Sequence, residues 1–254
     1  MTVLRETWIV FHRAMRLSLR NPMWSILMLS QPLMYLFLFG PLLKPITAQI
    51  SQGATTNAYQ VFIPGLIVQL GMFGAMFVGF GLIAEWRAGV IERMRVTPAH
   101  RMALLVGRVA RDVVVLLVQA TLLTLVAVPF GLRAPVGGVL LALLVVAFLA
   151  AAFSSLSYAA ALVLKSEDAL APLLNGIAIP LLLLSGILLP MSIAPAWLQT
   201  LSDVNPLKHI VDGVRAFFRG DLGTSTAGWG LFWAAVLVLA GVLVGTRTFR
   251  RESA

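Results

Sequence analysis

The sequence predicts an all-α integral membrane protein with six transmembrane helices. Of its 254 residues, 59% are hydrophobic and 11% are charged, whereas soluble domains carry about 25% charged residues. Six stretches without a charged residue are each about 20 residues or longer, the length that an α-helix needs to cross roughly 30 Å of hydrocarbon. Six crossings use roughly 120 residues, which leaves no room for a soluble catalytic domain. Residues 1–254 are therefore predicted to form a single transmembrane domain.

The predicted spans alternate with connecting segments. The spans cover residues 23–43, 61–84, 113–132, 136–164, 169–190 and 222–246. A charged loop over residues 85–111 joins spans 2 and 3, and an outer segment over residues 191–221 joins spans 5 and 6. No Asp, Glu, Lys or Arg lies inside a predicted span. This argues against a proton-coupled pump, because proton relays in membranes are built from such groups.

Residues 1–20 predict an amphipathic helix that lies in the membrane interface. At about 100° per residue, the apolar and basic side chains fall on separate arcs. These are Leu4, Trp8, Phe11, Met15 and Leu19 on one arc, and Arg13, Arg16 and Arg20 on the other. Apolar side chains toward the acyl chains and arginines toward the head groups are typical of an interfacial helix.

The basic residues predict the orientation in the membrane. Fourteen of the 19 lysines and arginines lie on the side that holds both termini and residues 85–111, and five lie on the other side. Cytoplasmic segments carry the excess of Lys and Arg, so both termini are predicted to be cytoplasmic. Orientation accounts for these residues, and no nucleic-acid partner is needed to explain them.

The outer segment predicts a second amphipathic helix. Asn205 is its expected N-cap, Pro206 its first residue, and Gly220 its left-handed C-terminal residue. The apolar face is Leu207, Ile210, Val211, Val214, Phe217 and Phe218, and the polar face is Lys208, Asp212, Arg215 and Arg219. We expect this helix to lie on, or dip into, the outer leaflet. Three residues are expected to fold the chain back at the end of span 5: Pro190, Pro195 and Trp197.

The motifs of a catalytic or nucleotide site are missing from the sequence. The three histidines lie outside the spans: His12, His100 and His209. Ser154, Ser155 and Ser157 therefore have no base at membrane depth, and they are expected to pack or bond between helices instead. No G-x-x-x-x-G-K-(S/T) sequence is present to bind ATP. The absence of cysteine excludes disulfides and thiolate metal sites. No cofactor or metal is predicted on this chain.

Four amide side chains within the spans are candidates to line a transport path: Gln31, Gln69, Gln119 and Asn175. The alternative is that they form hydrogen bonds between helices. Four glycines in span 2 allow close backbone approach, either within one bundle or at a subunit interface: Gly71, Gly74, Gly79 and Gly81.

The loop after span 2 carries the most specific pattern in the chain. Residues 85–98 read Glu-Trp-Arg-Ala-Gly-Val-Ile-Glu-Arg-Met-Arg-Val-Thr-Pro. A cytoplasmic position of this loop explains why it contains arginines. It does not explain the interleaved acidic residues or the placement of Gly and Pro. The segment fits E-x-R-x-G-x-x-E-R-(L/M)-x-x-(S/T)-P throughout, a pattern typical of the membrane subunits of type 2 ABC exporters.

Two further regions match the same family. They are Arg20-Asn21-Pro22 with Gln31-Pro32 in the first span, and Pro190, Pro195, Trp197-Leu198, Asn205-Pro206 and Arg215 in the outer segment. The tyrosine often found after the Asn-Pro pair is replaced by Lys208-His209. Over essentially its whole length, the chain resembles the daunorubicin-resistance and antibiotic-export permeases of actinobacteria.

The resemblance implies a permease subunit in the bacterial plasma membrane. Such a subunit exports a hydrophobic or amphiphilic cargo (drug, antibiotic, lipid or glycolipid) from the cytoplasm or the inner leaflet. It faces a second permease, either a copy or a paralogue, with membrane lipid around both. Two copies of a separate cytoplasmic ATPase, which hold the ATP and Mg²⁺, dock beneath them.

The resemblance also implies roles for individual residues. The residues expected to couple the permease to its ATPase are Glu85, Arg87, Gly89, Glu92, Arg93, Thr97 and Pro98. Those expected to form an outer gate are Pro190, Pro195, Trp197, Asn205, Pro206, Val214 and Arg215. The alternative function is a membrane anchor or assembly subunit that holds a cytoplasmic partner and transports nothing.

Overall fold

A computed structural model describes residues 3–50, 58–89, 100–188 and 191–252, and over these residues the chain forms helices and no strand. Five stretches are long and apolar enough to cross a membrane: Tyr59–Arg87, Met102–Phe130, Val136–Leu164, Glu167–Leu184 and Ser225–Phe249. A sixth is obtained if α1 (Val3–Arg20) and residues Ser25–Gly40 of α2 (Met23–Ile50), which are bent by 65°, count as one span. The prediction of an all-α, multi-pass membrane protein is confirmed.

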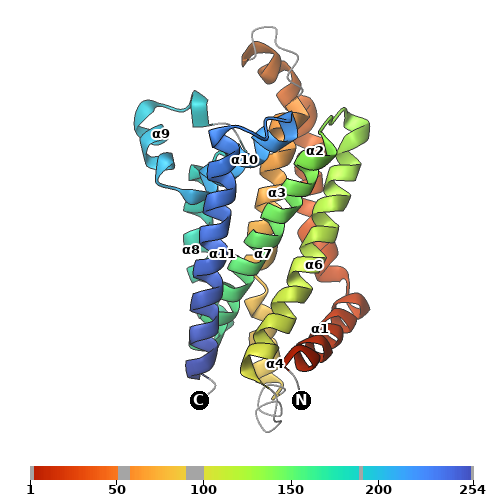
Figure 1. Cartoon of the computed structure of the whole chain (residues 1–254), viewed down its shortest axis with the longest axis vertical. Helices are drawn as coiled ribbons and strands as arrows, with labels where there is room; N and C mark the ends of the chain where they lie inside the picture. The colour runs from red at the N-terminus through yellow and green to blue at the C-terminus, as the bar shows by residue number, and fades with distance from the viewer. Residues whose placement is uncertain (1–2, 51–57, 90–99, 189–190, 253–254) are drawn as a thin grey trace.

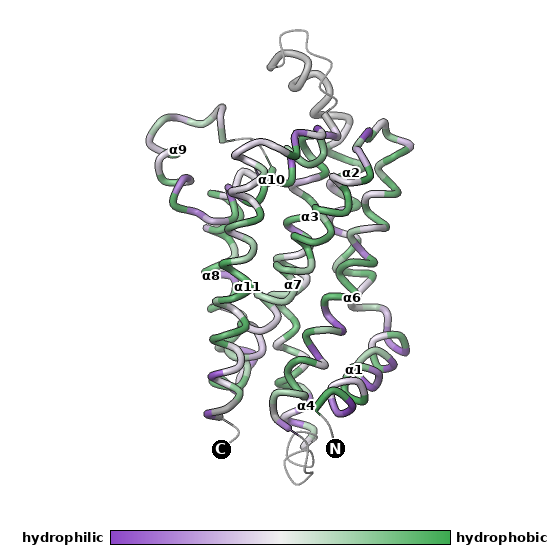
Figure 2. Tube along the Cα trace, in the orientation of Figure 1, coloured by the Kyte–Doolittle hydropathy of each residue, from purple (hydrophilic) through white to green (hydrophobic). Residues whose placement is uncertain are grey.

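The spanning helices form one bundle (Figure 1). They are α3 (Ala58–Met76) with α4 (Gly79–Arg87), α6 (Arg101–Ala127), α7 (Val136–Leu164), α8 (Glu167–Leu184) and α11 (Ser225–Glu252). Helix α7 packs against α3, α6 and α11. Figure 2 shows hydrophobic residues along most of the length of these helices. Helix α1, helix α4 and the end of α11 lie at the same end of the bundle (Figure 1), as an even number of crossings requires.

Helix α1 packs against α6 at this end (Figure 1). Gly107 allows the close approach, because a Cβ atom there would lie 2.8 Å from the carbonyl oxygen of Thr7. Leu4, Trp8 and Leu19 are exposed on the protein surface, whereas Glu6 is buried against the start of α6. Helix α1 thus packs on α6 through the side that holds Glu6, and its exposed residues include both these apolar side chains and Arg13, Arg16 and Arg20. The position of the apolar side chains among the acyl chains stays a prediction.

The start of α6 differs from the prediction. Residues 101–111, assigned above to a loop, are the first three turns of α6. Leu105 is buried there against α4 and α7, so packing extends the helix beyond the uncharged stretch. Arg108, Arg111 and Asp112 consequently lie within the apolar span Met102–Phe130, and the prediction that no span contains a charged residue is wrong.

The opposite end of the bundle holds the outer segment. It contains α9 (Ala196–Asp203) and α10 (Pro206–Arg219), and two short 3₁₀ helices lie nearby at Val128–Phe130 and Met191–Ile193. The side chain of Asn205 accepts a hydrogen bond from the Leu207 amide at 3.0 Å, and Gly220 has a φ of 88°. Both predicted caps of α10 are confirmed.

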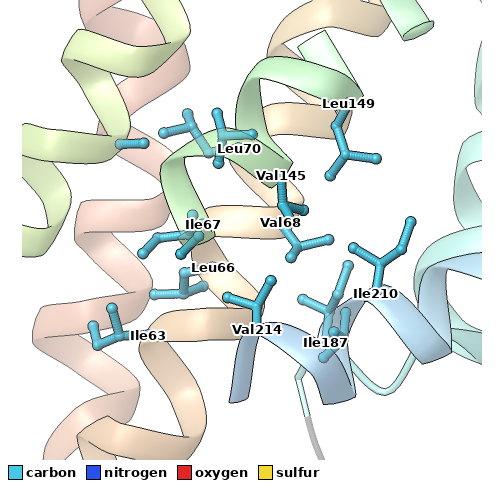
Figure 3. Packing of buried hydrophobic residues seen from close by; sticks show 14 of the residues in the cluster. Ile63, Leu66, Ile67, Val68, Leu70, Val145, Leu149, Ile187, Ile210 and Val214 are labelled. Carbon is cyan, nitrogen blue, oxygen red and sulfur yellow. The ribbon is translucent and has the colours of Figure 1, made fainter. Parts of the chain in front are cut away.

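The apolar face of α10 is buried inside the protein. Ile210 and Val214 pack with Ile63 and Leu66 of α3 and with Ile187 (Figure 3). Helix α10 also packs against α7 and α11. Neighbouring helices therefore cover this face, and the position of α10 on or in the outer leaflet stays a prediction.

Candidate functional site

The end of α4 places the first predicted coupling residues. Glu85 and Arg87 occupy its last turn, and Gly89 follows with a φ of 67°, which glycine adopts without strain. Glu92, Arg93, Thr97 and Pro98 lie outside the described residues.

A serine on α7 forms hydrogen bonds with the backbone at the break between α3 and α4. Ser157 Oγ donates to the carbonyl of Met76 at 2.5 Å and accepts from the amide of Gly79 at 2.9 Å. These backbone groups are freed by the break between α3 and α4, and lipid cannot satisfy them. The predicted role of this serine, bonding between helices, is confirmed.

Charged side chains tie the end of α4 to two other helices. Glu85 Oε2 accepts a hydrogen bond from Arg108 Nη2 on α6, and Arg87 Nη1 lies 3.2 Å from Glu167 Oε1 at the start of α8. Lys165 Nζ lies 4.9 Å from the ring centre of Trp86, the residue between Glu85 and Arg87 in the sequence. The side chains of Glu85 and Arg108 are 32% and 10% exposed. This ion pair is therefore screened less than the surface pair of Arg87 and Glu167.

The segment that follows α4 is held at its other end by α1. The amide of His100, the N-cap residue of α6, donates to Glu6 Oε2 at 2.8 Å. A carboxylate in this position accepts from a backbone amide at the start of the helix and complements the helix dipole. The described residues on either side of the segment 90–99 thus contact α1, α6 and α8.

A second polar cluster lies deeper on α6. The hydroxyl of Tyr158 on α7 donates to Asp112 Oδ2 at 2.7 Å. Asp112 Oδ1 lies 3.1 Å from Arg111 Nη1 without hydrogen-bond geometry, and so has no hydrogen-bond partner among the described atoms. The adjacent arginine and the tyrosine allow a carboxylate to be buried within a span. The signal in the sequence was Tyr158, whose hydroxyl needs a partner inside span 4.

Arg215 holds the outer segment to the bundle. Its Nε donates to the carbonyl of Val61 at 3.1 Å and its Nη2 to that of Gly186 at 2.6 Å, while Nη1 lies 3.3 Å from Asp212 Oδ1. The residue is 4% exposed although it lies on the predicted polar face of α10, because the carbonyls of Val61 and Gly186 and their surroundings cover it. Burial lowers the pKa of the guanidinium, and the charge of Asp212 opposes this shift. The group stays charged, as arginine does in proteins.

Only some of the other predicted gate residues are buried or bonded to the bundle. Asn205 Nδ2 donates to the carbonyl of Leu181 at 3.0 Å, which ties the start of α10 to α8. Val214 is 0% exposed within the core. Pro195 is the N-cap residue of α9, but Trp197 is 69% exposed and points away from this cluster. Pro190 lies outside the described residues.

The four amide residues lie in different surroundings, two buried and two exposed. Gln119 Nε2 donates to the carbonyl of Ser25 at 2.8 Å, beside a cavity of about 30 Å³ that Arg111 and Asp112 also line. Gln69 is buried, with its Oε1 unpartnered among the described atoms. Gln31 and Asn175 are exposed and bond to the Tyr35 hydroxyl and the Ala171 carbonyl of their own helices.

Replacing Val214 with aspartate is expected to destabilise the outer segment strongly. The new carboxylate would be buried without a cation in contact, at a cost of several kcal/mol. The matched control is Lys208→Gln on the polar face, where the ion pair affected is with the exposed Asp203. Thermal unfolding of the detergent-purified protein measures both. Equal melting temperatures for the two variants would show that α10 is not anchored by its apolar face.

Comparison with known proteins identifies the family of this chain. Residues 5–218 match the family described as ABC-2 type transporter. The chain is similar to the daunorubicin resistance ABC transporter permease protein DrrB1 of Streptomyces coeruleorubidus, with 26% identity over 100% of this chain and 89% of the relative. It is also similar to the putative transport permease ycf38 of Cyanophora paradoxa, with 26% identity over 85% of this chain and 74% of that protein.

A third relative is the probable multidrug ABC transporter permease YbhR of Escherichia coli K12, with 23% identity over 70% of this chain and 48% of that protein. The family match extends from α1 through the end of α4 to Phe218 of α10. It therefore includes both the ion-paired end of the bundle and the arginine-anchored outer segment. The chain belongs to the ABC-2 type transporter family.

Proposed function

We propose that this chain is the permease subunit of an ATP-driven exporter, with ATP hydrolysis on a separate cytoplasmic chain. The observation that carries the proposal is the attachment of both ends of the segment 90–99 to the bundle. Glu85 pairs with Arg108, Arg87 with Glu167, and Glu6 with the amide of His100. A segment attached in this way is suited to pass the movement of a docked partner to the spans.

The coupling works through differences in contact between two states. Two ATPase copies close on ATP, and a ligand shifts a conformational equilibrium only by binding one state more tightly than the other. The segment 85–98 makes those state-dependent contacts, and Glu92, Arg93 and Pro98 are the residues predicted to couple it to the partner. The ion pairs of Glu85 and Arg87 connect α4 to α6 and α8, so a movement of the segment is passed to these helices together.

The cargo is hydrophobic or amphiphilic, and the transport path forms against a second permease. The names of two relatives support this class of cargo, because they refer to daunorubicin resistance and to multidrug transport. The second permease is another copy of this chain or a paralogue. At the outer end, α10 forms the gate, held by Arg215.

The termini and the segment 85–98 are expected to face the cytoplasm of a bacterial cell. The chain contains no cysteine, so a single introduced cysteine reports its own side of the membrane. Thr97→Cys should stay unlabelled by an impermeant thiol reagent in intact cells, and Trp197→Cys, at the opposite end, should be labelled. The reverse pattern would invert the topology and remove the ATPase from this end.

Purification of the tagged chain from its native membrane tests the function. We expect an ABC ATPase to copurify, and its hydrolysis rate in proteoliposomes to rise when an exported cargo is added. A copurified ATPase whose rate is unchanged by every compound that the cell exports would favour the alternative, a membrane anchor. Copurification of no ATPase would contradict the exporter, and copurification of another cytoplasmic protein in its place would favour the anchor.

A further inference from the structure

A charged cavity lies between α1 and α6, beside the end of α4. Its volume is about 120 Å³. Three arginines and one carboxylate line it, namely Arg13, Arg108, Arg111 and Glu85, together with the apolar side chains of Val10 and Leu17. Arg111 pairs with Asp112 on one side, but none of the roles above uses Arg13 or explains why three arginines line one cavity.

The arginines retain hydrogen-bond donors for an anion. Arg108 forms an ion pair with Glu85. The Glu85 carboxylate, which would otherwise repel an anion in the cavity, is neutralised by this pair. Arg13 is exposed and makes no ion pair with the described residues. Arg111 has its Nε buried without a hydrogen-bond partner among the described atoms, while its Nη1 faces Asp112. Guanidinium groups bind phosphate oxygens through paired, charge-assisted hydrogen bonds.

The surroundings favour a lipid as the source of the phosphate. Val10 and Leu17 form an apolar wall beside the arginines, and Leu4, Trp8 and Leu19 are exposed on the same helix. An interfacial helix places such side chains among the acyl chains, with its arginines at the level of the head groups. A free phosphate ion would leave the apolar wall facing water, whereas a phospholipid covers that wall with its glycerol and acyl carbons.

We propose that this cavity binds the phosphate group of an anionic phospholipid from the leaflet in which α1 lies. Arg13 and Arg111 bind the phosphate, and Val10 and Leu17 contact the apolar part of the lipid. The site belongs to the permease alone, so lipid binding requires neither ATP nor an ATPase. Failure of the proposed export function would therefore leave this inference standing, and the reverse is also true.

Native mass spectrometry of the full-length permease, released from a neutral detergent, tests the site. Phosphatidylglycerol is titrated against phosphatidylcholine, and bound lipids are counted. We expect a preference for phosphatidylglycerol and about a fivefold weaker apparent affinity in Arg13→Gln, the loss that one basic residue near an anionic lipid accounts for. The matched control, Arg16→Gln, removes an exposed arginine from the same helix that does not line the cavity, and should bind like the wild-type protein.

Three results would overturn the proposal. Equal losses in Arg13→Gln and Arg16→Gln would mean that only the general charge of α1 attracts lipid. Unchanged binding in Arg13→Gln would remove the cavity as the site. Displacement of the bound lipid by millimolar inorganic phosphate, without a preference for phosphatidylglycerol, would make this a site for free phosphate. Arg13 is exposed and unpaired among the described residues, so these readings do not depend on a variant that fails to fold.

Discussion

Replacing Arg215 with alanine is expected to lower the free energy of unfolding by about 2–4 kcal/mol, because hydrogen bonds from a buried charged group are lost and their acceptors stay buried. The carbonyls of Val61 and Gly186 would both lose their donor. These carbonyls belong to the start of α3 and to the residues after α8, so the outer segment loses its attachment to both. Thermal or denaturant unfolding of the purified permease in detergent measures the loss.

Two further variants separate this effect from a general loss of charge. Arg219→Ala, one turn along the same helix, removes only an exposed pair with Asp221, and should cost at most about 1 kcal/mol. Arg215→Lys keeps the charge but loses the planar group that reaches two carbonyls at once, so its stability should be intermediate. If Arg215→Ala unfolds like Arg219→Ala, the anchoring role of Arg215 is refuted.

Replacing Gly65 with alanine is the second large change expected. A Cβ atom at this position in α3 would lie 2.2 Å from the carbonyl oxygen of Ile187. The Cβ atom is bonded directly to the backbone and the carbonyl oxygen belongs to it, so neither atom can be moved away by rotating a side chain. Overpacking of this kind typically costs about 1–3 kcal/mol, and here it also shifts the residues that accept from Arg215. We expect a lower melting temperature and a loss of any outer gating that depends on this packing.

Gly176 on α8 is the matched control for that change. A Cβ atom there has nothing within 4 Å, so Gly176→Ala should stabilise the helix by up to about 1 kcal/mol through helix propensity alone. The two alanine variants are therefore expected to move the melting temperature in opposite directions. A Gly65→Ala variant at least as stable as the wild-type protein would mean that α3 does not depend on contact with Ile187.

The helices and local caps could be predicted from sequence because their causes are local. Long uncharged stretches predict spans, and an Asn-Pro pair followed fifteen residues later by glycine predicts the ends of α10. Asn205 and Gly220 act on neighbouring backbone, so nothing distant is needed to identify them. The apolar face of α10 could be predicted for the same reason, although its periodicity did not reveal whether lipid or protein covers it.

The charged residues were misplaced because their partners are distant. Hydropathy places the start of span 3 after Asp112. The hydroxyl of Tyr158 on another helix, however, donates to the Asp112 carboxylate and makes its burial tolerable. Periodicity assigns Arg215 to the polar face, but carbonyls from α3 and from the chain after α8 bind its guanidinium. The coupling motif identified Glu85 and Arg87, yet no pattern in the sequence showed that Arg108 and Glu167 would pair with them.

The coupling role of the Glu85–Arg108 pair is tested most directly by measuring export and ATP hydrolysis together in proteoliposomes that contain the permease and its ATPase. Glu85→Arg would place two cations where Arg108 is only 10% exposed, and export should fall by at least about tenfold, which corresponds to about 1.4 kcal/mol. ATP hydrolysis should continue. The double variant Glu85→Arg with Arg108→Glu restores opposite charges and should recover most of the export. Export by Glu85→Arg at the wild-type rate, or no recovery in the double variant, would contradict coupling through this ion pair.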